Sequence, residues 1–139
     1  MNAKKKFTTG LIKFELENEF DEVFCSFKMN PTDVNLMKRA EEVAEYFNKW
    51  QMETANLVSG DELSKYNSII EEKINYLLGY DATKEVFGEV TATTIFPNGS
   101  VFVIELMEFI FEKLEPEIEK RNKNIQAKMQ KYTEKYQKK

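Results

Sequence analysis

Carboxylates are the residues of this chain whose spacing comes nearest to that of a chemical site. Several stand in close pairs, which in proteins can bind a metal ion or transfer protons. These pairs are Glu15 with Glu17, Glu41 with Glu42, and Glu71 with Glu72. None has a further ligand at a suitable spacing elsewhere, so we interpret them as the solvated charged faces of strands and helices. They predict no metal site.

Cys25 is the only cysteine, and the chain has no histidine that could activate its thiol. Histidine is also the commonest general base and metal ligand, so its absence argues against most enzyme classes. The five glycines are dispersed and form no phosphate-binding loop. We therefore expect no catalytic residue, no metal and no cofactor, in a protein that is not an enzyme. Cys25 is expected to pack in the core.

The segment LGYDATKEVFGE, residues 78–89, has two glycines nine residues apart. It is too apolar for a solvated loop, yet it offers only one Asp, one Thr and one Lys for chemistry. We interpret it as a structural joint between helices rather than a site. In this joint Gly79 ends a helix, Asp81 caps a short helical turn, Val86 and Phe87 plug the core, and Gly88 releases the chain.

Charge is distributed unevenly along the chain. Residues 1–6 carry three lysines, residues 7–116 carry nine Lys/Arg against 21 Asp/Glu, and residues 117–139 carry eight Lys/Arg against three Glu. An acidic body of net charge −12 with two basic ends suits head-to-tail attraction between molecules, or a polyanion bound by the C-terminus. Lysines that end a long solvated helix also complement its dipole. We favour protein partners over nucleic acid, because the C-terminal tyrosines lie at helical seam positions.

The length and composition fit one domain, with 139 residues of which 42% are hydrophobic and 13% aromatic. No apolar stretch has the length of a signal peptide or a membrane span, and a single cysteine fits a reducing compartment. We expect a cytoplasmic protein with a flexible basic N-terminus (1–10), a globular domain (11–115) and a basic C-terminal helix or extension (116–139).

The N-terminal part predicts a β-hairpin, because residues 11–17 and 23–29 alternate apolar and polar side chains with the period of a strand. Two strands alone are barely stable, so the hairpin must lie on helices or join a neighbour's sheet. Asn30 and Pro31 then have the types favoured at a helix start. The stripe that follows predicts a helix into the mid-fifties: Leu36, Ala40, Val43, Phe47 and Trp50.

A second helix is predicted from the capping-box spacing of Ser59 and Glu62 to Gly79. It should pair antiparallel with the first. After Gly88 the sequence has two interpretations: a hairpin turning at Asn98-Gly99, or a helix capped at Asn98 or Ser100. We favour the helix, because its apolar spacing continues far beyond the length of a strand. Its face comprises Val103, Met107, Phe111 and Leu114. The fold class is mainly α (α+β), with the hairpin packed on an antiparallel helical core.

The apolar spacing continues to the C-terminus and resembles a heptad seam with one polar interruption at Asn122. Pro116 should kink or break this long helix. Few partners for the seam exist in a body of this size, so we predict that it binds a partner protein or a second copy; the hairpin edge is the other candidate for self-association. The predicted partner-binding residues are Ile118, Ile125, Met129, Tyr132 and Tyr136.

The order of these parts resembles that of the small tail assembly chaperones of long-tailed phages and prophages of Gram-positive bacteria. The resemblance rests on the NPTD helix start (30–33), the VFG segment (86–88) and the lysine-rich end KMQKYTEKYQKK (128–139), and it covers most of residues 10–139. It implies a non-enzymatic protein of the bacterial host cytoplasm that self-associates and binds tape-measure and tail-tube proteins. The alternatives are a phage-encoded inhibitor of a host defence system or host enzyme, and a structural virion component.

Overall fold

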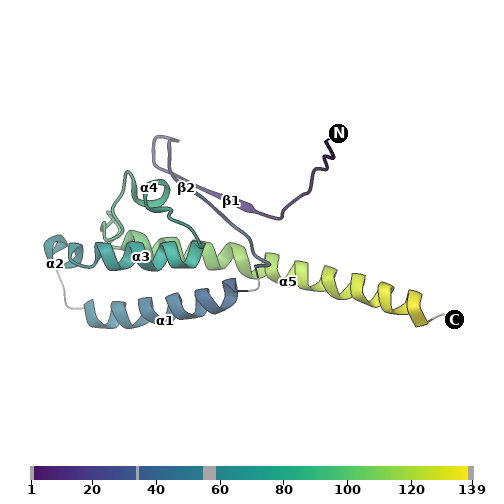
Figure 1. The fold of residues 1–139 in the computed structure, drawn as a ribbon. Coiled ribbons are helices and arrows are strands. Elements are labelled where there is room, and N and C mark those ends of the chain that lie inside the picture. Colours follow the sequence, from purple (N-terminus) through teal and green to yellow (C-terminus); the bar gives the residue numbers. More distant parts are fainter. Residues whose placement is uncertain (1, 34, 55–58, 138–139) are drawn as a thin grey trace.

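The computed structural model describes residues 2–33, 35–54 and 59–137, apart from the side chains of residues 60, 132 and 135–137. A hairpin precedes five helices in the order β1 (Ile12–Glu17), β2 (Val23–Met29), α1 (Leu36–Thr54), α2 (Gly60–Ser64), α3 (Asn67–Leu78), α4 (Thr83–Phe87) and α5 (Phe102–Gln137). Figure 1 shows α1 on one side of α3 and α5, and the hairpin and α4 on the other. The predicted α+β class, mainly helical with a long C-terminal helix, is confirmed.

The predicted hairpin is confirmed as an antiparallel pair in which Ile12 lies opposite Met29 and Phe14 opposite Phe27. The Phe14 and Phe27 rings stack 5.0 Å apart, and Phe14 meets Phe109 of α5 edge-on at 5.8 Å. These rings bury one face of the hairpin on the long helix. The turn is held by Asn18, whose side-chain oxygen accepts the backbone N–H groups of the residues two and four positions further on, at 2.9 and 3.1 Å.

Helix α1 begins at Leu36, so the prediction of a helix start at Asn30-Pro31 is wrong. The Asn30 side chain instead accepts the N–H and hydroxyl of Thr32, at 3.1 and 3.0 Å, and so caps a turn rather than a helix. Asp33 takes the place nearer the helix, because its carboxylate accepts the N–H of Asn35 at 3.0 Å. The predicted stripe is buried as expected, and α1 packs against α3.

The predicted second helix is divided into α2 and α3. Ser59 caps α2 as predicted, with its hydroxyl oxygen 3.2 Å from the N–H of Glu62. Asn67, the first residue of α3, has a distant partner. Its side-chain oxygen accepts both the N–H and the hydroxyl of Thr93, at 3.2 and 2.9 Å, which fixes the segment that leads into α5.

The segment before α5 combines both interpretations of the sequence. A tight turn does form at Asn98-Gly99, where Gly99 has φ +87° and the N–H of Phe96 donates to Ser100 at 2.8 Å. Only one isolated β-bridge, between Ile95 and Val101, accompanies it. The favoured helix then begins at Phe102, so the predicted cap at Asn98 or Ser100 is wrong. Its predicted face lies in the core, with Phe111 partly buried.

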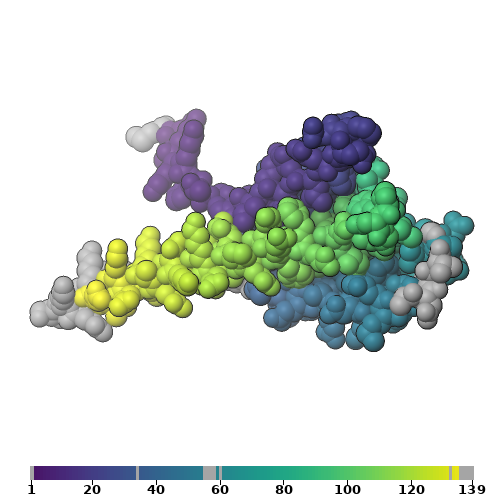
Figure 2. All heavy atoms as spheres, turned by 180° about the vertical axis from the view of Figure 1, so that it is seen from behind, coloured from purple at the N-terminus to yellow at the C-terminus, as the bar shows by residue number. Residues whose placement is uncertain are grey.

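Helix α5 runs unbroken through Pro116 to Gln137 (Figure 1), so the alternative of a break at the proline is wrong. The Pro116 ring lies on an exposed position. The first half of α5 supplies the centre of the core, where Phe102, Val103, Leu106 and Ile110 are almost fully buried. The C-terminal part of α5 projects from the body, as the space-filling view in Figure 2 shows.

Candidate partner-binding surfaces

The tail helix, residues 117–137 of α5, presents an uncovered apolar surface. Ile118 still packs against the core, whereas Ile125 and Met129 are 51% and 61% exposed. These two lie one turn apart on the same face of the helix. The first residue of the predicted seam is therefore covered by the body, and the next two described apolar residues are exposed to solvent. The side chains of Tyr132 and Tyr136 lie outside the described part of the chain, so their place in the seam stays a prediction.

The tail helix is fixed where it leaves the body. Arg121 and Glu117 form an ion pair of 2.9 Å, and both side chains are largely shielded from solvent. Gly10, with φ +83°, passes so close that a Cβ there would lie 2.9 Å from a guanidinium nitrogen of Arg121. The N-terminal segment therefore crosses the helix at this point, and body contacts continue past the predicted domain boundary at residue 115.

Cations line one margin of the seam. Arg121 lies four residues before Ile125 and Lys128 three residues after it, so both flank its apolar face. The ion pair between Lys123 and Glu119 is 3.4 Å long and fully in solvent, where such a pair contributes little to stability. The tail helix therefore offers apolar side chains bordered by positive charge.

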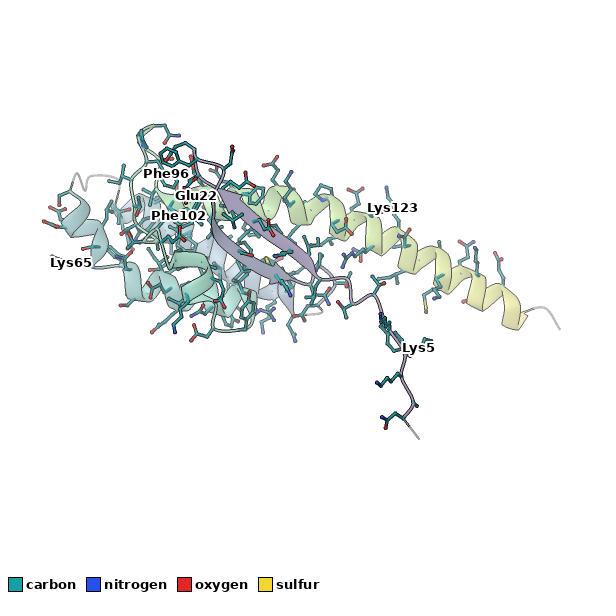
Figure 3. The ribbon with its side chains drawn as sticks, turned by 90° about the horizontal axis from the view of Figure 1, so that it is seen from above. Lys5, Glu22, Lys65, Phe96, Phe102 and Lys123 are labelled. Carbon is teal, nitrogen blue, oxygen red and sulfur yellow. The ribbon has the colours of Figure 1, made fainter. Side chains whose placement is uncertain are left out.

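A second surface lies at the opposite end of the molecule, between the hairpin turn, the segment after α4 and the start of α5. It is a groove with a volume of about 780 Å³, which we call the acidic groove. Its floor is aromatic and aliphatic: Leu16, Phe24, Val90, Phe96, Phe102 and Phe109. The Phe102 ring is central, 5.7 Å from the ring of Phe24 and 5.8 Å from that of Phe96. Figure 3 shows Phe96 and Phe102 beside the hairpin.

Carboxylates surround this floor. They come from the hairpin, from the segment after α4 and from α5: Glu15, Glu17, Glu19, Glu89 and Glu105. No Lys or Arg lines the groove within the described ranges. Lys13 pairs with Glu15 at 3.0 Å from outside, and Glu105 accepts the Ser100 hydroxyl at 2.6 Å. Over the same part of the chain, Glu17, Glu19 and Glu89 form no ion pair.

The sequence interpretation missed this groove and treated Glu15 and Glu17 as part of a solvated face. Both are indeed exposed. A β-bulge between Leu16 and Glu17 shifts the strand register at the groove. The alternation of glutamates with apolar residues near the hairpin turn was the available signal. Glu89 and Glu105, however, join them only through the tertiary fold.

Helix α3 ends at Gly79 as predicted, and α4 ends at Phe87, the residue before Gly88. Gly79 has φ +85° and ends α3, with its N–H donating to the Asn75 carbonyl at 2.9 Å. A Cβ on Gly88 would overlap the carbonyl oxygen of Lys84. Val86 is fully buried and Phe87 nearly so, which agrees with their predicted place in the core.

Asp81 has a smaller role in this joint than predicted. Its carboxylate lies 3.4 Å from the N–H of Thr83, a long contact for a cap. Asn75 holds the joint instead. Its side-chain oxygen accepts the N–H of Ala82 at 2.8 Å, and its amide nitrogen donates to the Thr83 hydroxyl at 2.9 Å. An asparagine one turn before the helix end was the signal for this role.

A further open cavity of about 570 Å³ lies where β2, α1 and the end of α3 meet. Arg39 borders it, donating to the Leu77 carbonyl at 3.3 Å and pairing with Asp33 at 3.0 Å. The N–H of Asn35 and the Arg39 guanidinium hold the pKa of the Asp33 carboxyl below its usual value. These bonds satisfy Arg39 within the fold, which makes this ion pair structural.

The remaining features to consider are the single cysteine, groups that could bind a metal ion, and helices that could span a membrane. Cys25 is buried in the hairpin as predicted, and burial raises the pKa of its thiol to about 12, which keeps it protonated. Among the described residues, no group of three or more Cys, Asp or Glu side chains could hold a metal ion. No helix in the same residues has the length and apolarity to cross a membrane.

Comparison with protein-family models finds a match over most of the chain. Residues 18–139 match the model of a family of unknown function, DUF6673. No curated protein and no solved structure matches the chain. The matched range includes β2, all five helices and the tail helix, together with most of the acidic groove.

Proposed function

The chain belongs to the DUF6673 family of unknown function, and we propose that it is a non-enzymatic protein that binds other proteins through its tail helix. The observation that carries this proposal is the exposed seam of Ile125 and Met129 on a helix that has left the core. Apolar side chains grouped on one projecting element mark interaction surfaces. Helices with such a face bind by laying it into a groove of the partner.

The size of the seam sets a scale for this binding. Burying Ile125 and Met129 would remove about 200 Å² of apolar surface from water, worth about 5 kcal/mol at about 25 cal/mol per Å². The loss of translational and rotational freedom on association costs at least a comparable free energy. Tight binding therefore needs further contacts beyond the two described side chains, and the lysines beside the seam are available for them.

The proposed partners follow from the resemblance to tail assembly chaperones. In this role the protein acts in the cytoplasm of the bacterial host, self-associates, and keeps a tape-measure protein soluble while tail-tube subunits are recruited. A tape-measure protein is a long chain, and any amphipathic helix in it would offer an apolar face that a projecting seam can cover. The buried and protonated Cys25 thiol is in keeping with a role that needs no catalysis.

Co-expression with the tape-measure protein of the same phage genome tests this proposal. The soluble fraction of the tape-measure protein should rise with the wild-type chain and fall back with the double variant Ile125→Ser/Met129→Ser. The matched control is Met52→Ser/Ile69→Ser, which removes an exposed Met and an exposed Ile from α1 and α3. It should act like the wild type. A tape-measure protein that is equally soluble with and without the wild-type chain would contradict the proposal.

A further inference from the structure

We propose that the acidic groove is the docking site for the tail helix of a second copy of this chain, so that copies associate head to tail. The inference deepens the proposed self-association and rests on the tail helix being a docking element. It names both surfaces of the contact, one on each copy.

The two surfaces are complementary in chemistry. The acidic groove has an apolar floor and five carboxylates on its rim, and no Lys or Arg lines it in the described residues. The tail helix has an apolar face of Ile125 and Met129, bordered by Lys128 and with further lysines at positions 120, 123 and 131. Each surface therefore supplies the charge that the other lacks. Matching of this kind orients the partners and speeds their encounter.

A helix docks in a groove through anchors four and seven residues apart. Ile125 and Met129 give the first two anchors, and Tyr132 stands at the third position of the same pattern. The partly buried rings at the groove floor, those of Phe24, Phe96 and Phe109, are the side chains that such anchors would cover. Glu17, Glu19 and Glu89 have no cation of their own within the described chain and are free to meet the lysines.

A chain cannot fill its own groove with its own tail helix. Helix α5 is continuous from Phe102, at the groove, to Gln137. Ile125 lies sixteen residues beyond Phe109, about 24 Å away at about 1.5 Å per residue. Figure 3 shows Lys123 far along the tail helix and Phe96 and Phe102 at the other end of the molecule. The groove is therefore filled by another copy, unless α5 breaks.

Contacts between two different surfaces have a definite consequence for the assembly. After two copies dock, the pair keeps one free groove and one free tail helix, so growth continues until a ring closes or a chain of copies ends. A symmetric dimer, by contrast, would use the same surface on both copies and would stop at two. The assembly state thus distinguishes head-to-tail docking from tail-to-tail pairing.

Two full-length variants test the two surfaces independently. The groove variant carries Glu17→Lys, Glu19→Lys and Glu89→Lys, and the tail variant carries Lys123→Glu, Lys128→Glu and Lys131→Glu. A control with Glu41→Lys, Glu53→Lys and Glu72→Lys changes the net charge as the groove variant does, but at exposed positions on α1 and α3. Circular dichroism verifies that all three are folded. Sedimentation velocity then measures the assembly.

The wild type and the control should associate, and each of the two interface variants should dissociate at least about tenfold more readily. An equimolar mixture of the groove variant and the tail variant should regain association beyond a dimer, because the intact groove meets the intact tail helix, and the reversed groove and the reversed tail helix are again opposite in charge. High salt should weaken the wild-type assembly, since exposed charges are screened.

Four results would overturn the inference: a monomeric wild type, interface variants that associate like the wild type, a mixture that stays monomeric, and loss of association in the groove variant alone. The last result would identify the basic N-terminal segment as the occupant. The proposed function is judged separately by tape-measure solubility. A groove variant that loses self-association while it still solubilises the tape-measure protein supports both statements, because its tail helix is unchanged.

Discussion

The side-chain oxygen of Asn75 lies 2.8 Å from the backbone nitrogen of Ala82 and accepts its hydrogen bond across the joint between α3 and α4. The same side chain donates to Thr83, and the Asn75 carbonyl receives the N–H of Gly79. One residue thus connects the end of one helix with the start of the next. Because Ala82 and Val86 are fully buried, this connection also sets how α4 closes the core beside β2.

Replacing Asn75 with alanine should destabilise the fold. Asn75→Ala leaves the N–H of Ala82 without its partner in a partly buried place, which costs about 1–3 kcal/mol. Urea denaturation followed by circular dichroism measures the change in the free energy of unfolding. Asn124→Ala, on the exposed tail helix, is the control and should change that free energy little. Equal effects of the two substitutions would contradict the role given to Asn75.

Gly79→Ala should lower the free energy of unfolding by about 1–2 kcal/mol, because of backbone strain alone. Gly79 has φ +85°, a conformation in which a Cβ is strained. The space around it is sufficient, since the nearest atom to an added Cβ, Nη2 of Arg39, lies 3.6 Å away. Gly79→Asn should cost less than Gly79→Ala, because asparagine tolerates the left-handed region better. Thermal unfolding of the two variants tests this order, and the reverse order would argue against a conformational cause.

Phe102→Ala should be among the most damaging single changes. The ring is almost fully buried and contacts Phe24, Phe87 and Phe96, so its removal leaves a cavity that the fold cannot close. Losses of this kind amount to about 3–5 kcal/mol. Val101→Ala, one position earlier and only partly buried, should cost much less. Chemical denaturation of both variants measures the difference.

The Cys25 thiol should resist thiol reagents in the folded protein. Burial raises its pKa from the ordinary 9.0 to about 12, so the reactive thiolate is scarce at neutral pH. Between about pH 9 and 12 the unfolded chain loses this proton and the folded chain keeps it, so the free energy of unfolding falls as pH rises. Cys25→Ala should remove this part of the pH dependence. Rapid labelling of the native protein at pH 8 would contradict the burial.

The sequence predicted the elements that depend on local patterns. Alternation in residues 11–17 and 23–29 predicted the hairpin, and the glycine at position 79 predicted the end of α3. It failed where a side chain has a distant partner. Asn67 holds Thr93, 26 residues away, a contact that no local pattern in the sequence indicates. The start of α1 was misplaced for a local reason: Asn30 accepts from Thr32 within a turn, and Asp33 lies closer to the helix that follows.

The same limit applies to the binding surfaces. The seam of the tail helix was predictable, because residues of one helix face recur at fixed intervals in the sequence. That Ile118 would be covered and Ile125 exposed depends on where the body ends in space. The acidic groove joins Glu17 with Glu89 and Glu105 from three separate segments. No periodicity connects such residues, so only the tertiary structure brings them together.

Pro116→Ala should stabilise the protein and stiffen its tail helix. Helix α5 passes through Pro116 without a break, although proline gives no N–H to the carbonyl of Glu112 and crowds the preceding turn. Alanine restores that bond at an exposed position, with a gain of up to about 3 kcal/mol relative to proline inside a helix. Thermal unfolding measures the stability, and amide exchange across residues 117–131 measures the order of the tail helix. Slower exchange there with unchanged exchange in α1 is expected, whereas faster exchange would show that the proline supports the helix.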